Sequence, residues 1–339
     1  MSAILALETG QVFHGSSVGV AGIRVGEVVF NTALTGYQEI LTDPSYTQQL
    51  IAFTCPHIGN TGINIEDYQG NQIYASGVII KSLSSYVSNW RANTNLQTYL
   101  QQQGTVAITD IDTRSLTKIL RTHGALRGCI MTEELDAQQA IKAAKQFPGL
   151  QGIDLTNIVS TRTAYVVNGK AAPHVVLLDF GVKRSIIQIL SDLNCKVTVV
   201  PAKSAVDDIL SLEPDGILLS NGPGDPEACL GLIENITQLL STGLPIFGIC
   251  LGHQLLALAL GAKTYKMNFG HHGANHPVQN ISNKKVLITS QNHGFAVHEA
   301  SLGSDLEVTH ISLFDGSLQG FRHKKRPLFG FQGHPESAP

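Results

Sequence analysis

The sequence predicts an α/β protein in which a mixed α+β N-terminal domain precedes a C-terminal domain with a mostly parallel sheet and flanking helices. The chain has 339 residues, a length that favours two domains with separate cores. Up to about residue 150 the segments are mixed and rich in turns, whereas from His174 onward strand-length apolar runs alternate with helical ones. This alternation is typical of parallel strands joined by crossover helices. We therefore expect domains at 1–150 and 173–339, with an inter-domain linker at 151–172.

The N-terminal half contains segments with the composition of strands and segments with the signals of helices. Residues 26–32 and 76–80 have the composition of strands. Asp112 or Thr113 can cap a helix that runs to about His123, where Gly124 would end it. A second helix is expected from Asp136 to Phe147, before Pro148. Three polar, glycine- or proline-marked segments are predicted to be turns: 35–39, 42–46 and 56–62.

The C-terminal half begins, after a short strand expected at 164–167, with a continuous apolar run at 175–180. A sheet covered by helices on both faces requires strands of this kind. The later elements repeat the alternation. We expect helices at 184–193, 205–212 and 251–260, a further helix that follows Pro226 and runs to about Leu240, and strands at 196–201, 216–220 and 244–249.

Cys250 stands where the last of these strands turns at once into a helix. Gly248 and Gly252 lie on either side, and glycine removes the Cβ atoms that would block such a sharp bend. The bend places the cysteine at the positive end of the new helix, which favours the nucleophilic thiolate. An isolated cysteine in an apolar stretch is more often core packing. The glycines on both sides make a catalytic nucleophile the better interpretation.

Two further segments can complete a site around Cys250. The loop that contains Gly222 and Gly224 follows the strand at 216–220, and ligands of open α/β sheets bind beyond the carboxyl ends of strands. Its bare backbone N–H groups, with that of Leu251, can form an oxyanion hole, although the loop alone would be read as a tight turn. Near the chain end, His334 and Glu336 alternate in a segment expected to be extended. The carboxylate can therefore orient the imidazole.

Composition limits the classes of function. Apolar residues make up 43% and charged residues 14%, as in an ordered globular protein, and the formal charge of −3 is spread without long runs of one sign. We expect neither a nucleic-acid surface nor a membrane surface. The apolar run at 3–7 is too short for a signal peptide or a membrane span. Five scattered cysteines show neither metal-ligand nor disulfide spacing, which favours a reducing cytoplasm.

A group of histidines lies outside the site expected around Cys250. His271, His272 and His276 could suggest a metal site, but no cysteine or acidic ligand accompanies them and the glycines favour a loop. We therefore predict no metal site. Residues 290–295, which contain another histidine, are predicted to be a polar turn that lines a pocket or joins two strands.

Taken together, these motifs resemble a known family. Gly-Ile-Cys-Leu-Gly-His-Gln at 248–254, Gly-His-Pro-Glu at 333–336 and Ser-Asn-Gly-Pro-Gly-Asp-Pro at 220–226 resemble the class I glutamine amidotransferases. The N-terminal half is similar to the small, glutamine-hydrolysing chain of carbamoyl-phosphate synthase. The segments that carry this likeness are 26–32, 35–46, 56–62 and 112–117. The likeness covers almost the whole chain.

The resemblance implies a role for each matching residue. Cys250 would attack the side-chain amide of glutamine, His334 would transfer protons, and Glu336 would hold His334. The N–H groups of Leu251 and Gly224 would stabilise the oxyanion. The resemblance implies that the residues contacting glutamine are Ser45, Gly222, Gly224, Leu251, Gln254, Asn292, Gly294 and Phe295. Ser45 would bring one wall of the pocket from the N-terminal domain.

The resemblance also implies partners. Ammonia would pass through a tunnel to a large synthetase chain that uses ATP, Mg²⁺ and bicarbonate, for arginine and pyrimidine synthesis. No cofactor is expected on this chain, which has no Gly-x-x-x-x-Gly-Lys-Ser/Thr loop. A higher oligomer of such heterodimers is left open.

One departure from the family pattern leaves alternatives. The family continues beyond His-Pro-Glu into a C-terminal helix, whereas this sequence stops at Pro339, so we expect either a fragment or a chain without that helix. The alternatives are a catalytically impaired chain that only binds and regulates its partner, or the glutaminase of another class I amidotransferase complex.

Overall fold

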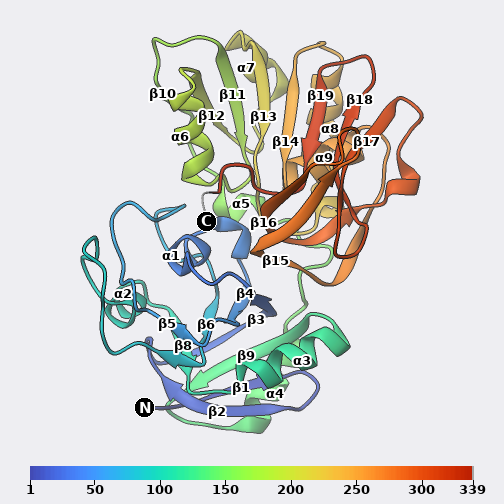
Figure 1. Ribbon diagram of the computed structural model, residues 1–339. Helices are drawn as coiled ribbons and strands as arrows, with labels where there is room; N and C mark the ends of the chain where they lie inside the picture. Colours follow the sequence, from blue (N-terminus) through green and yellow to red (C-terminus); the bar gives the residue numbers. More distant parts are fainter. Residues whose placement is uncertain (338–339) are drawn as a thin grey trace. The chain divides into compact units, whose positions relative to one another are not determined.

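The computed structural model describes residues 1–337, which form two compact units with separate hydrophobic cores (Figure 1). The first unit comprises Met1–Leu150 with Asn268–Gly273, and the second comprises Gln151–Met267 with Ala274–Pro339. The predicted fold class is confirmed, since a mixed N-terminal part is followed by an α/β sheet with helices on both faces. Within the described residues, no helix is both long and apolar enough to cross a membrane.

The first unit is built on a closed barrel of seven strands, which the sequence analysis did not foresee. In barrel order the strands are β1 (Ser2–Leu7), β2 (Val12–Ser17), β8 (Val106–Thr109), β6 (Gly77–Ile79), β4 (Gln49–Phe53), β3 (Ile23–Asn31) and β9 (Leu126–Thr132). The run β3–β4–β6–β8 is parallel and the other pairs are antiparallel. A separate two-stranded sheet pairs β5 (His57–Ile58) with β7 (Ser82–Leu83).

Three helices of the first unit start at side-chain caps. They are α2 (Leu96–Gln102), α3 (Thr113–His123) and α4 (Ala137–Gln146). The Asp112 carboxylate accepts a hydrogen bond from the Ser115 N–H, and Gly124 follows α3 with a φ of 89°. Asp136 caps α4 in the same way. The two helices predicted from these caps are therefore confirmed within a residue or two at each end.

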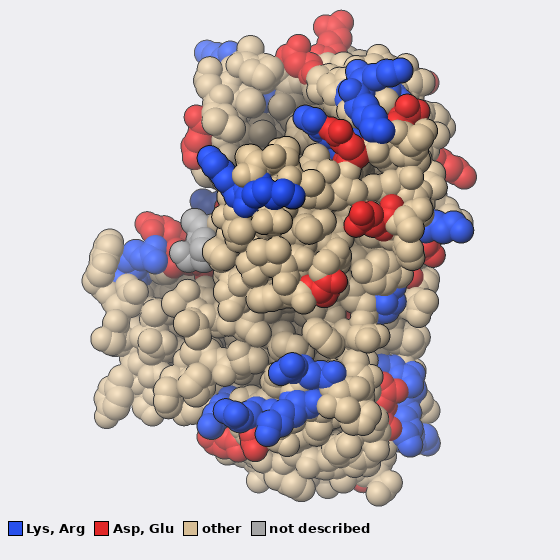
Figure 2. Space-filling model, turned by 45° about the vertical axis from the view of Figure 1, so that its right-hand side comes forward, with Lys and Arg blue, Asp and Glu red and all other residues tan. Residues whose placement is uncertain are grey.

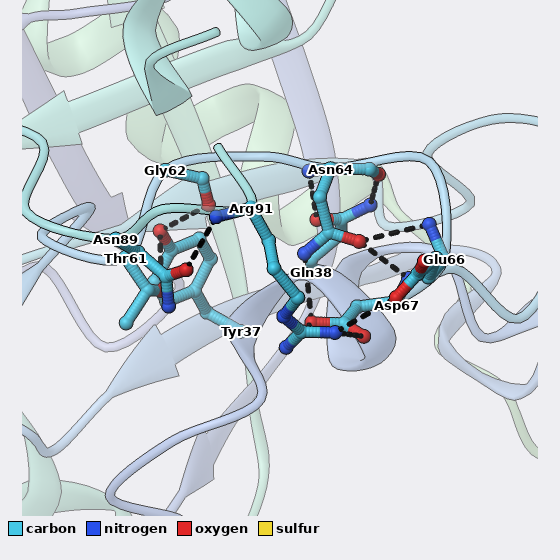
Figure 3. Close-up of polar contacts among 9 residues, drawn as sticks. All are labelled: Tyr37, Gln38, Thr61, Gly62, Asn64, Glu66, Asp67, Asn89 and Arg91. Carbon is cyan, nitrogen blue, oxygen red and sulfur yellow. Dashed lines mark hydrogen bonds and ion pairs between the residues drawn. The ribbon is translucent and has the colours of Figure 1, made fainter. Parts of the chain in front are cut away.

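The turn predicted at 35–39 is wrong in part, because Tyr37 starts the short helix α1 (Tyr37–Leu41), followed by the 3-10 turn η1 (Pro44–Tyr46). Hydrogen bonds to neighbouring loops stabilise this helical turn (Figure 3). Gln38 donates to the Asn64 carbonyl at 2.6 Å and accepts from the Asn64 N–H at 3.0 Å. The loops that hold Asn64 and Arg91 are themselves joined, because both terminal N–H groups of Arg91 donate to the Asp67 carboxylate, at 2.9 and 2.8 Å. Such distant partners cannot be read from local composition.

The second unit is organised around one ten-stranded sheet. In spatial order its strands are β10 (Tyr165–Val167), β12 (Lys196–Pro201), β11 (His174–Asp179), β13 (Gly216–Leu219), β14 (Ile246–Ile249), β19 (Leu328–Phe331), β18 (Leu318–His323), β17 (Leu306–Ser312), β15 (Thr264–Asn280) and β16 (Val286–Val297). The five strands from β12 to β19 are parallel, and the strands that flank them are antiparallel. The expected linker 151–172 holds α5 (Thr156–Val159) and β10, which pairs with β12.

Helices cover both faces of the parallel strands. They are α6 (Arg184–Asp192), α7 (Val206–Ser211), α8 (Leu230–Leu240) and α9 (Leu251–Ala259), with short 3-10 turns η2 (Pro226–Ala228) and η3 (Glu299–Ser301). Leu178 packs with residues of α7, α8 and α9, whereas Leu177 packs with Ile186 of α6. Adjacent strand residues point to opposite faces, so a run that is apolar throughout becomes buried on both sides.

Two predicted loops are strands. Residues 271–276 belong to β15 and residues 290–295 belong to β16, and the histidines at 271, 272 and 276 are buried. Local composition was misleading because pairing with neighbouring strands overrides the turn preference of glycine and asparagine. Among residues 1–337, no group of three His, Cys, Asp or Glu side chains has an arrangement that could hold a metal ion.

Charged side chains are scattered over the surface seen in Figure 2. Small groups of lysine and arginine alternate there with aspartate and glutamate, separated by wide uncharged areas. The view agrees with a formal charge of only −3 over the sequence.

Candidate active site

Cys250 occupies the strained bend between β14 and α9. Its φ of 53° lies in the left-handed region, which non-glycine residues rarely adopt. Both neighbouring glycines are required by close backbone contacts. A Cβ atom on Gly252 would lie 2.1 Å from the Leu219 carbonyl oxygen, and one on Gly248 would lie 2.4 Å from the Gly252 carbonyl oxygen. The sequence motif therefore produces a bend that other residues cannot form.

Polar groups surround the sulfur of Cys250, although the residue is only 2% exposed. The thiol donates to the Asn292 carbonyl oxygen at 3.5 Å, and the Gln332 side-chain amide donates to the sulfur at 3.7 Å. The core cysteine Cys229 also donates to a backbone carbonyl, at 3.5 Å, so the side-chain amide donor is the partner that distinguishes Cys250. This environment is consistent with a reactive sulfur.

His334 and Glu336 form a buried pair, and His334 lies close enough to the Cys250 sulfur to interact with it electrostatically. His334 Nδ1 lies 2.7 Å from Glu336 Oε1, and among the described residues Nε2 has no hydrogen-bond acceptor or donor. The carboxylate thus fixes the tautomer and leaves Nε2 available for proton transfer. Pro335 and Glu336 lie in a turn, so the extended segment predicted here is wrong, and Glu336 reaches His334 around the turn.

Lys183 is a third member of this buried group. Its Nζ lies 2.8 Å from Glu336 Oε1 and also donates to the Ser337 hydroxyl at 2.8 Å. Both charged side chains are nearly inaccessible, at 7% for Lys183 and 3% for Glu336. Lys183 was not singled out from the sequence. Its place at the start of α6, in the short connection that follows β11 at the carboxyl edge of the sheet, is the signal that could have indicated it.

The charges in this group control its protonation. Burial has the largest single effect and lowers the pKa of His334, as does the charge of Lys183, but the Glu336 carboxylate and the Cys250 sulfur together outweigh both. The pKa of His334 is raised to about 10. Burial would raise the pKa of Glu336, but Lys183 and His334 together hold the pKa of that carboxyl well below its usual range. Near neutral pH the pair is therefore an imidazolium and a carboxylate.

The path of the loop after β13 is determined by hydrogen bonds of the Asn221 side chain to backbone groups and by two closely packed glycines. The Asn221 side chain donates to the Gly181 carbonyl and accepts from the Lys183 N–H, at 2.9 and 3.1 Å. Gly222 approaches so closely that a Cβ atom there would lie 2.1 Å from the Phe180 carbonyl oxygen. Gly224 has a φ of 97° and pairs with Asp154. Both glycines are thus needed for the path of the loop, independently of any ligand.

The other predicted residues of the second unit lie on α9 and β16. Leu251 opens α9, where the first N–H groups of a helix have no intrahelical acceptor. Gln254 is in the same turn, and its amide donates to the Phe295 carbonyl oxygen at 2.7 Å and to Gln332 Oε1 at 3.0 Å. Gly294 lies between Asn292 and Phe295 on β16. Gln332 was not predicted from the sequence.

Ser45 is the predicted site residue of the first unit. It lies in η1, is 8% exposed, and its N–H donates to the Asp43 carboxylate at 2.9 Å.

Comparisons with known proteins agree with this division of the chain. Residues 5–130 match the family model for the carbamoyl-phosphate synthase small chain, CPSase domain, and residues 176–339 match that for class-I glutamine amidotransferases. The chain is 54% identical to the carbamoyl phosphate synthase small chain of Vibrio cholerae, over 100% of this chain and 94% of that protein. The chain belongs to the carbamoyl-phosphate synthase small chain family.

Other members of the family show similar agreement. Identity to the small chain of Thioalkalivibrio sulfidiphilus is 55%, over 99% of this chain and 93% of that protein. Identity to the small chain of Pasteurella multocida is also 55%, over 99% of this chain and 91% of that protein. As a member of the small chain family, the protein is the glutamine amidotransferase subunit of a ligase, and membership implies glutamine as substrate and a large-chain partner.

Proposed function

We propose that this small chain hydrolyses L-glutamine to glutamate and ammonia through a thioester on Cys250, and delivers the ammonia to its large chain for carbamoyl phosphate synthesis. The observation that carries the proposal is the strained Cys250, held beside a buried His334–Glu336 pair. Nucleophile, proton carrier and orienting carboxylate are the parts that a triad needs.

In the first half of the reaction the imidazolium of His334 stabilises the Cys250 thiolate, which attacks the side-chain carbonyl carbon of glutamine. The C=O π electrons move to oxygen, and the N–H groups of Leu251 and Gly224 would stabilise the resulting oxyanion. When the intermediate collapses, the C–N bond breaks and the leaving nitrogen takes the proton from His334. Ammonia and a glutamyl thioester result.

In the second half, neutral His334 removes a proton from water, and the resulting hydroxide adds to the thioester carbon. Collapse breaks the C–S bond, returns the thiolate and releases glutamate. Glu336 stabilises the imidazolium in both halves, because its carboxylate lies 2.7 Å from Nδ1. The buried Lys183 keeps this carboxylate ionised.

The pocket proposed for glutamine in the second unit includes the Gly222–Gly224 loop, Gln254 and the β16 residues Asn292, Gly294 and Phe295. We also propose that ATP, Mg²⁺ and bicarbonate bind to the large chain, that this chain carries no cofactor, and that the product serves arginine and pyrimidine synthesis in the cytoplasm. The N-terminal family match supports this partner over that of another amidotransferase complex.

A glutamine-analogue chloroketone tests the nucleophile directly. We expect it to alkylate Cys250 in the wild-type chain, with protection by glutamine. In the complex with the large chain, Cys250→Ser should abolish glutamine-dependent carbamoyl phosphate synthesis and preserve synthesis from free ammonia. Absence of labelling, or loss of both activities in a complex that still assembles, would contradict the proposal.

A further inference from the structure

Gln332 is placed beside the nucleophile by the register of the central sheet. β14 and β19 are parallel neighbours with Ile249 opposite Phe331 (Figure 1), so the next residue of each strand, Cys250 and Gln332, leaves the sheet at the same edge. Backbone hydrogen bonds hold both. Cys250 N–H donates to the Phe331 carbonyl at 3.0 Å, and Gln332 N–H donates to the Gln319 carbonyl at 2.8 Å. The position of Gln332 is therefore determined before its side chain makes any contact.

The orientation of the Gln332 amide follows from a backbone carbonyl. The Phe295 carbonyl oxygen can only accept, so the Gln254 amide nitrogen must face it, at 2.7 Å. The second N–H of Gln254 donates to Gln332 Oε1 at 3.0 Å. This contact turns the Gln332 amide nitrogen toward Cys250 Sγ, at 3.7 Å. The chain of hydrogen bonds thus begins at an acceptor and ends in a donor directed at the sulfur.

A donor at this place has a chemical consequence. The sulfur also contacts the Asn292 carbonyl oxygen at 3.5 Å, which accepts from a thiol and opposes the negative charge of a thiolate. The Gln332 N–H favours the thiolate over the thiol, because a hydrogen bond to an ionised acceptor is stronger than one to a neutral acceptor. Gln332 is 0% exposed, so water does not compete for this N–H.

We propose that Gln332 is a catalytic residue whose side-chain amide stabilises the Cys250 thiolate, as nucleophile and as leaving group, and at the same time accepts the second N–H of Gln254. Because Gln254 uses both N–H groups on protein acceptors, it is left with its carbonyl oxygen for the substrate, and so contacts an N–H donor of glutamine. The assignment rests on the proposed glutaminase function and adds a residue that links substrate binding to the nucleophile.

The chain offers a matched control in Gln319. It is also 0% exposed, and its side chain accepts from the Gln291 amide at 2.8 Å and donates to the Ser317 hydroxyl at 3.3 Å rather than to the sulfur. Methionine is close to glutamine in volume and has no donor. The Gln332→Met and Gln319→Met variants should therefore lose comparable packing and buried hydrogen bonding, whereas Gln332→Met alone removes the donor to Cys250.

The experiment measures three quantities in each variant, in complex with the large chain. They are kcat and KM for glutamine hydrolysis, the rate at which iodoacetamide alkylates Cys250 without glutamine, and Tm. For Gln332→Met we expect kcat to fall about 10- to 100-fold, the effect of one hydrogen bond to an ionised group. KM should rise by a smaller factor as Gln254 loses an acceptor, and alkylation should slow by about 10-fold or more. For Gln319→Met, kcat and alkylation should stay within about twofold of wild type, because its side chain does not contact the sulfur.

Two results would overturn the assignment: wild-type kcat and alkylation in Gln332→Met, or equal losses in Gln319→Met, which would indicate a purely structural role. Failure of the proposed function is distinguishable. If the wild-type complex hydrolyses no glutamine, that function is refuted, while the alkylation rates still show whether Gln332 stabilises the thiolate.

Discussion

The buried ion pair of Lys183 and Glu336 allows a double-mutant cycle with a defined sign. The perturbations are Glu336→Gln, Lys183→Met and the double variant. In the wild type, Glu336 Oε1 accepts from Lys183 Nζ at 2.8 Å and from His334 Nδ1 at 2.7 Å, so one oxygen serves two cations. Each single variant therefore removes a different part of one network, and their effects should not add.

The expected magnitudes follow from burial. Glu336→Gln leaves Lys183, with a 7% exposed side chain, without its carboxylate, and should destabilise the fold by about 3–5 kcal/mol. Lys183→Met leaves Glu336 paired with His334 and should cost about 1–3 kcal/mol. The double variant has no uncompensated lysine, so it should be more stable than the sum of the single effects predicts, with a coupling energy of about 1–3 kcal/mol.

The pH dependence has a definite direction. The pKa of folded His334 is about 10, above its ordinary 6.5, so its contribution to stability is fully present below pH 6.5 and is lost as pH rises toward 10. The folded pKa of Glu336 is depressed from 4.5, so its contribution is present above pH 4.5 and is lost on acidification. The stability deficit of Glu336→Gln should be greatest between pH 4.5 and 6.5 and should decline toward pH 10.

The free energy of unfolding of the wild type and the three variants is measured by urea denaturation at pH 6 and pH 9.5. Glutaminase kcat is measured on the same samples. The activity of Glu336→Gln should fall further than that of Lys183→Met. The reason is that the carboxylate raises the pKa of His334, whereas the lysine lowers it. A coupling energy of zero would refute this reasoning. So would a loss of folding stability in Glu336→Gln, relative to wild type, that grows between pH 6 and pH 9.5.

Three further predictions concern other parts of the chain. Gly252→Ala should abolish glutaminase activity and lower Tm, because its Cβ would lie 2.1 Å from a backbone oxygen; Gly231→Ala, with no atom within 4 Å, is the control and should keep both. Gln38→Leu should destabilise the first unit by about 2–4 kcal/mol in urea titration, because it removes two buried hydrogen bonds to Asn64; an unchanged midpoint would contradict this. Gly330→Ala should lower Tm, since its Cβ would lie 2.7 Å from Nδ1 of the buried His253; wild-type Tm would show that this ring can move.

Most elements with strong local signals could be predicted. The Asp112 and Asp136 caps located α3 and α4, and the apolar runs after His174 located the parallel strands. Errors occurred where distant pairing overrides local composition. Residues 271–276 looked like a loop because of their glycines, but hydrogen bonding to neighbouring strands makes them part of β15. The barrel of the first unit was missed because its closure depends on pairing between segments far apart in the sequence.

The same distinction applies to the site. Glycines at 248 and 252 are a local requirement of the bend, so Cys250 could be identified from the sequence. Lys183 and Gln332 could not, because neither lies in a recognisable motif for its role. Lys183 meets Glu336 across 153 residues of chain, and Gln332 reaches Cys250 because β19 pairs with β14.

By itself, the sequence determined the strained cysteine, the His-x-Glu pair, the capped helices and the alternation that produces a parallel sheet, since each depends on residues close together in the chain. Only the tertiary structure decided which strands became neighbours, and with that which buried lysine and which glutamine amide face the reacting groups. The physical reason is that hydrogen bonds and ion pairs act over a few ångströms in space, at any separation in sequence.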